Sequence, residues 1–144
     1  MIQAILTNPY SIFIPFLLAS FVGYVTYRNN RKVRYANACA AFRAAVLAKF
    51  PGVYPIPTTW PANPNAFFRS VFSDLQVAFQ QFRPFVPLYK RWLFDRAWFK
   101  YRCATGRKID LQCYHHYMDF SNQPDPKIVF RQNVDRLLSF AKQT

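Results

Sequence analysis

Five residues in the second half of the chain are of types that bind metals or act in catalysis. They are Cys103, Cys113, His115, His116 and Asp119. Their spacing, Cys-x9-Cys-x-His-His-x2-Asp, differs from that of zinc sites, whose cysteines normally lie two to four residues apart. On a helix, His115 and Asp119 would share one face, as a pair of ligands or as a base oriented by a carboxylate.

A structural role for this cysteine–histidine cluster is the interpretation that we favour. Free cysteines usually pack as small buried hydrophobic residues, and no neighbouring group marks an activated thiolate. We therefore expect no catalytic residue, no bound metal and no cofactor. The alternative is a membrane-associated metal-dependent enzyme that uses His115, His116 and Asp119.

A second candidate is the aromatic and basic segment from Phe85 to Lys108. Its helical periodicity predicts two aromatic faces, and a helix with two apolar faces needs two partners. We assign one face to the domain core: Phe85, Leu88, Tyr89, Trp92 and Phe99. We expect the other to contact a partner or the membrane interface: Phe94, Trp98 and Tyr101, bordered by Lys90, Arg91 and Arg102. Burial of both faces within the domain is the alternative.

The N-terminal region is expected to anchor these residues to a membrane. No charged side chain occurs from Met1 to Tyr27. A helix over about 9–27 would be about 28 Å long, close to the thickness of the hydrocarbon core of a bilayer. The stretch ends in aromatic residues typical of a membrane interface, and a basic cluster that suits anionic lipid head groups follows. These residues are Tyr24, Tyr27, Arg28, Arg31, Lys32 and Arg34.

Charge counting favours an uncleaved anchor over a signal peptide or a buried core helix. A signal peptide begins with a positively charged region, which the first eight residues lack. The basic residues follow the apolar stretch, so the positive-inside rule predicts an outside N-terminus and a cytoplasmic C-terminal domain. We expect a single-pass protein, for example in a bacterial inner membrane.

The sequence pattern as a whole predicts an all-α protein, with one N-terminal transmembrane helix and a small cytoplasmic domain of three to five short helices. We divide it into an anchor (1–27), a basic juxtamembrane helix (28–50), a Pro-rich extended segment (51–65) and a basic, aromatic-rich helical domain (66–144). Apolar residues at three- and four-residue steps predict a helix over 66–83, and Asp125-Pro126 is typical of a helix start. Residues 109–113 suit either a short strand or a helix from Asp110.

The composition limits the function classes. A net charge of +13 with 19% aromatic residues is typical of proteins that bind polyanions, and 52% hydrophobic residues exclude a disordered basic tail. No sequence signature of a nucleic-acid-binding fold is present, so we expect the anionic leaflet of a lipid bilayer as the polyanion. We expect a scaffold or accessory subunit that binds other membrane-protein subunits. A membrane-tethered nucleic-acid-binding protein is a further alternative.

Overall fold

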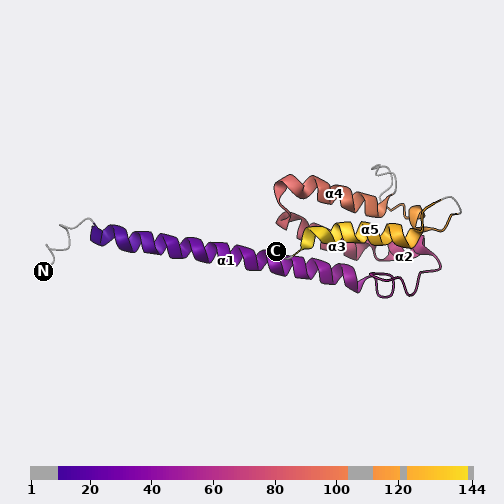
Figure 1. The fold of residues 1–144 in the computed structure, drawn as a ribbon, viewed down its shortest axis with the longest axis horizontal. Helices are drawn as coiled ribbons and strands as arrows, with labels where there is room; N and C mark the ends of the chain where they lie inside the picture. The colour runs from indigo at the N-terminus through magenta and orange to yellow at the C-terminus, as the bar shows by residue number, and fades with distance from the viewer. Residues whose placement is uncertain (1–9, 104–111, 121–122, 143–144) are drawn as a thin grey trace. The chain divides into compact units, whose positions relative to one another are not determined.

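The computed structural model describes residues 10–103, 112–120 and 123–142, with side chains from Phe13 onward. Five α-helices occur within these ranges: α1 (Tyr10–Ala48), α2 (Pro64–Ser70), α3 (Phe72–Phe82), α4 (Leu88–Arg102) and α5 (Pro126–Leu138) (Figure 1). Single 3-10 turns cover Arg83–Phe85, His115–Tyr117 and Ser139–Ala141. The described ranges contain no strand, only an isolated parallel bridge between Cys103 and Cys113. The all-α expectation is confirmed.

The chain divides into two compact units, Met1–Ala36 and Asn37–Thr144. In the first unit, the described residues form one uninterrupted stretch of helix α1. This helix continues through Pro15 and past the expected boundary between residues 27 and 28. The anchor and the juxtamembrane segment are therefore parts of one helix.

The transmembrane span expected at about 9–27 finds no support in the structure. Within the part of the chain that the structure describes, no helix combines the length and the apolar character that crossing a membrane requires.

Helices α2 and α3 replace the single helix predicted over 66–83. Pro64 occupies the first turn of α2, and the Asn63 side chain accepts a hydrogen bond from the Ala66 amide at 3.1 Å. A turn at Val71 then separates the two helices. Most of the predicted apolar stripe is nevertheless buried, since only Val71 and Phe72 of its members are half-buried and the others lie in the core: Phe68, Leu75, Ala78, Phe79 and Phe82.

The Pro-rich segment packs against the helices, as predicted. The Trp60 ring lies 5.8 Å from the ring of Phe130 on α5, centroid to centroid. The Tyr54 hydroxyl donates a 2.6 Å hydrogen bond to Asp135 on the same helix. Gly52, the second residue of the segment, has a φ of +75°, and a Cβ there would clash with Thr59 Oγ1, so the position favours glycine.

An aromatic core joins the helices of the second unit. Phe68 stacks on Phe130 with ring centroids 4.9 Å apart, and Phe42 stacks on Phe82 at 4.7 Å. The predicted start of the last helix is confirmed, since Asp125 caps α5 through the Lys127 amide. Its predicted inner face is buried: Phe130, Val134, Leu137 and Ala141.

Helices α4 and α5 run antiparallel beside one another (Figure 1). Phe94 in the middle of α4 meets Phe140 just after α5, with ring centroids 5.2 Å apart. Tyr101 near the end of α4 meets Phe130 near the start of α5 at 6.3 Å. This pairing decides which face of α4 is covered.

Candidate interaction surface on helix α4

The face of α4 that we expected to be external lies in the core. Phe94 and Tyr101 are fully buried and Trp98 is 5% exposed, so the predicted contact surface is wrong for these three rings. Phe94 and Trp98 both stack on Phe79 of α3, with ring centroids at 4.5 and 4.9 Å. Stacked pairs of this kind contribute about 0.5–1.5 kcal/mol beyond their buried area. This face of α4 is therefore packed against α3 and α5.

Two polar side chains on the buried face, those of Trp98 and Arg102, also have partners. The Trp98 indole N–H donates a 3.0 Å hydrogen bond to Gln76 Oε1. The Arg102 guanidinium lies over the ring of Phe99 at 4.7 Å and over that of Trp98 at 5.3 Å. Burial lowers the pKa of Arg102 from its usual value, and these cation–π contacts offset part of the cost of desolvation. Arg102 thus belongs to the packed interior and is not at a surface.

The opposite face of α4, which we had assigned to the core, is exposed except for Phe99, which is half-buried. Leu88, Tyr89 and Trp92 are 76%, 71% and 59% exposed, and Leu93 and Phe85 lie partly in solvent beside them. Apolar patches of this kind on a folded domain mark contact surfaces. We call Leu88, Tyr89, Trp92 and Leu93 the α4 contact face.

Two arginines fix the α3–α4 connection and hence the direction of the contact face. Arg83 holds both oxygens of Asp95 at 2.8 Å, which joins the end of α3 to the middle of α4. Arg91 donates to the carbonyl oxygens of Val86 and Pro84 at 3.0 and 2.9 Å. Arg91 was predicted to border a contact surface, but its donors are engaged by the connecting turn. Lys90 stays exposed beside Tyr89.

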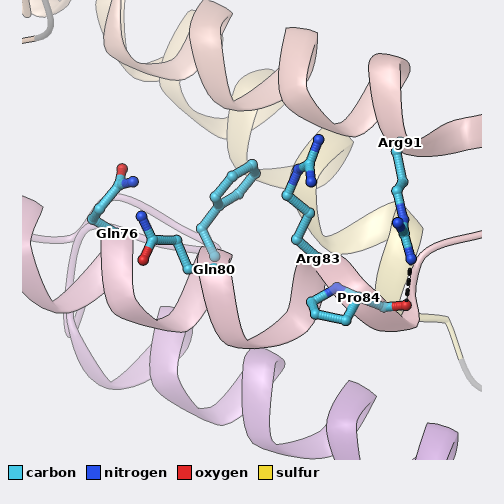
Figure 2. A pocket seen from close by; sticks show the side chains of 6 residues that line it. Gln76, Gln80, Arg83, Pro84 and Arg91 are labelled. Atoms are coloured by element: carbon cyan, nitrogen blue, oxygen red, sulfur yellow. Dashed lines mark hydrogen bonds between the residues drawn. The ribbon is translucent and has the colours of Figure 1, made fainter. Parts of the chain in front are cut away.

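A cavity of about 440 Å³ lies beside this connection (Figure 2). Gln76, Gln80, Arg83, Pro84 and Arg91 line it, together with Phe79. Both arginines already have partners, as Figure 2 shows for the bond from Arg91 to Pro84. Neither arginine is available to an anionic ligand. We therefore do not treat this cavity as a binding site.

The predicted lipid-facing residues of the first unit are all on the surface of α1. Tyr24 and Tyr27 are 57% and 65% exposed, and the Arg28 guanidinium lies 5.8 Å from the Tyr24 ring. The other members of the basic cluster are exposed too: Arg31, Lys32 and Arg34.

The cysteine–histidine cluster is divided between buried and exposed positions. The backbones of Cys103 and Cys113 form the isolated bridge and neither cysteine is part of a disulfide, whereas His115 and Asp119 are exposed. Burial lowers the pKa of His116 to about 4, so its ring is neutral at pH 7. Among the residues that the structure describes, no three His, Cys, Asp or Glu side chains are placed to hold a metal ion.

A buried hydrogen-bond network ties this region to α4 and α5. The Tyr117 hydroxyl donates to the Tyr101 carbonyl oxygen at 2.9 Å and accepts from the Asn133 amide at 3.0 Å. Burial raises the pKa of Tyr117 well above its usual value, so the hydroxyl stays protonated and can make both bonds. The network locks the end of α4 against α5.

Sequence reasoning found both faces of α4 but assigned them the wrong way round. Both carry rings and both carry cations, so composition could not separate them. One signal was available: Ala97 lies between Phe94 and Tyr101 on the helix surface, and a small residue there lets α5 approach closely. The exposed cations Arg96 and Lys100, and Arg136 and Ser139 on the facing element, were not singled out at all.

Comparison with known proteins does not assign this chain to a family. No family model matches the sequence, and no significant match to a curated protein or to a solved structure is found.

Proposed function

We propose that this chain is a small membrane-anchored interaction protein. The N-terminal part of α1 inserts into a lipid bilayer, and the basic helical domain stays at its cytoplasmic face as a scaffold or accessory subunit. The α4 contact face is the surface through which the domain engages its partner.

The observation that carries the proposal is the exposed apolar part of α1. From Phe13 to Tyr27 the helix has no charged side chain, and its large residues are between 39% and 69% exposed. They cover most of the helix circumference, and Ala19, Gly23 and Thr26 lie on the remaining side, so the stretch is uncharged all round, which favours burial in an apolar medium over one-sided packing on a surface. The exposed basic cluster from Arg28 to Arg34 follows directly, where lipid head groups would lie.

The described part of the stretch is slightly shorter than a bilayer. Eighteen residues of α1 from Tyr10 to Tyr27 give about 27 Å of helix, against a hydrocarbon core of about 30 Å. Local thinning of the bilayer accommodates a short helix at a modest cost in free energy.

A flotation experiment with charge insertions tests the anchor. Full-length protein should float with neutral phosphatidylcholine vesicles after a carbonate wash. The double variant Leu17→Arg/Leu18→Arg should stay at the bottom of the gradient, because each arginine at the centre of a span costs about 2.5–3.5 kcal/mol. Val33→Arg, an exposed position on the same helix, is the matched control and should float. Flotation of the double variant, or loss of the unmodified chain on washing, would reject the anchor.

Two further measurements test orientation and partnership. A cysteine introduced at Asn8 should react with an impermeant thiol reagent from the outside, whereas one at Lys142 should be protected; the reverse pattern would invert the proposed topology. Co-purification from membranes in mild detergent should recover other subunits with the unmodified chain and lose them with Tyr89→Ala. Equal recovery with both proteins would remove the contact face from the proposal.

A further inference from the structure

A cavity of about 360 Å³ opens between α4 and α5, close to the α4 contact face. Its cationic lining consists of Arg96 and Lys100 from α4 and Arg136 from α5, with Ser139 at the following turn. Leu93, Ala97 and Phe140 supply its apolar walls. The volume equals that of roughly a dozen water molecules, enough for a phosphate group with its substituents.

Among the residues that the structure describes, no negative charge compensates the three cations of this cavity. No acidic side chain lines it, and within the described ranges none of the three cationic groups has a hydrogen bond or an ion pair. The acids adjacent to them in sequence are engaged elsewhere, Asp95 by Arg83 and Asp135 by Tyr54 and Arg131. The cavity beside the α3–α4 connection differs, because each of its arginines has a partner.

The apolar surface that continues from the cavity indicates what kind of anion fits. Leu93 both lines the cavity and belongs to the contact face, which extends along α4 to Trp92, Tyr89 and Leu88. From Lys100 to Leu88 the helix rises about 18 Å. A ligand that is anionic at one end and apolar over the rest would meet the cations and the rings together.

We propose that the cavity between α4 and α5 binds the phosphate of an anionic phospholipid, with the α4 contact face against its apolar part. The proposal rests on the membrane-anchored function and names the partner of the same surface. Arg96 and Arg136 present planar forks of donors that match phosphate oxygens, and Lys100 adds a third charge. Trp and Tyr next to basic residues are the side chains favoured at the membrane interface.

Water-soluble short-chain lipids separate this site from the N-terminal anchor. Full-length protein in neutral detergent is titrated with dihexanoyl phosphatidic acid below the concentration at which it forms micelles, and intrinsic tryptophan fluorescence reports binding near Trp92. Dihexanoyl phosphatidylcholine and inorganic phosphate are the comparison ligands. We expect phosphatidic acid to bind at least tenfold more tightly than either, because only it offers an uncompensated anion and an apolar part together.

Two matched triple variants identify the residues. Arg96→Gln/Lys100→Gln/Arg136→Gln should weaken binding of phosphatidic acid by tenfold or more. Arg28→Gln/Arg31→Gln/Lys32→Gln removes the same charge from α1 and should leave this affinity within twofold. Circular dichroism melting of each variant checks that the fold is retained, and the single variants Arg96→Gln and Arg136→Gln replace the triple if it unfolds.

Each alternative result overturns the proposal in a different way. Equal losses in both triple variants would mean that net charge alone attracts the lipid. Equal affinity for inorganic phosphate would mean a site for free phosphate, not for a lipid. Tighter binding of a single-stranded oligonucleotide, lost in the cavity variant, would assign the surface to nucleic acid. No binding of any ligand would remove the site.

The outcome is independent of the anchor test. Flotation on neutral vesicles depends on the apolar part of α1, and the Leu17→Arg/Leu18→Arg variant leaves the cavity untouched. If that variant fails to float but still binds soluble phosphatidic acid, both proposals stand. If the unmodified chain does not float but binds the soluble lipid, the anchor fails and the site remains.

Discussion

The two faces of helix α4 are built from similar residues but lie in different surroundings. The buried face has Phe94, Trp98 and Tyr101, and the contact face has Leu88, Tyr89 and Trp92. The buried rings pack against aromatic rings on α3 and α5, and the indole N–H of Trp98 donates a hydrogen bond to Gln76. The rings of the contact face lie in solvent. A ring becomes part of the core when rings on neighbouring elements can pack against it, and its hydrophobicity alone does not decide its place.

The largest effect should come from removing the central ring of the buried face. Trp98→Ala leaves a cavity against Phe79 and an unpaired Gln76, and should lower the free energy of unfolding by about 3–5 kcal/mol. Denaturant titration followed by circular dichroism measures it. Trp98→Phe, which keeps a ring for stacking and loses only the hydrogen bond, should cost less. If Trp98→Ala were as stable as Trp92→Ala, the two faces would not differ.

The hydrogen-bond network behind the buried face should give a smaller loss. Tyr117→Phe leaves the Asn133 amide and the Tyr101 carbonyl without their partner in the interior, which should cost about 1–3 kcal/mol. Tyr54→Phe removes an exposed hydroxyl bond to Asp135 and is the matched control. We expect it to cost less than about 1 kcal/mol in the same denaturant titration. Equal losses would show that burial of the network adds nothing.

Protonation of His116 tests whether the interior next to this network tolerates a charge. Burial lowers the pKa of His116 from 6.5 to about 4, so between these values the unfolded chain binds more protons than the folded one. Stability is therefore complete above pH 6.5 and declines as the pH falls toward 4. We expect a loss of up to about 2 kcal/mol, since solvent that reaches the ring screens part of the cost.

Unfolding midpoints at pH 7, 5.5 and 4.5 measure this slope. His116→Asn should flatten it, whereas His115→Asn, at an exposed position, should leave it unchanged. An unchanged slope in His116→Asn would assign the acid sensitivity to other groups.

Local sequence signals predicted the helices and much of the core. The stripe from Phe68 to Phe82 and the Asp125 cap depend on residues a few positions apart, so the sequence contains the information needed to place them. The turn at Val71 was missed because Val71 itself continues the apolar pattern and no Gly or Pro marks the break. The orientation of α4 was predicted wrongly because its two faces differ only in which other helices pack on them. The sequence of α4 alone does not contain that information.

The cavity between α4 and α5 could not be predicted from the sequence for a related reason. Arg96 and Arg136 are forty positions apart and come together only because α4 and α5 run antiparallel. A charged residue on a helix surface looks the same whether or not a second helix brings another cation beside it. That no described acid compensates these cations is likewise a property of the folded arrangement, since Asp95 and Asp135 are close in sequence but engaged elsewhere.

The smallest expected effect completes the comparison of the two faces. Trp92→Ala should change the free energy of unfolding by no more than about 0.5 kcal/mol, because the ring has little packing to lose.

Acrylamide quenching of fluorescence measures the exposure of the two rings independently, in variants that keep a single tryptophan. With Trp60 and Trp98 replaced by Phe, the fluorescence of Trp92 should be strongly quenched. With Trp60 and Trp92 replaced by Phe, that of Trp98 should be protected. Anionic short-chain lipid should then protect Trp92 and leave Trp98 unchanged, because only the exposed ring belongs to the α4 contact face. Protection of Trp92 before any lipid is added would mean that the chain itself covers this face.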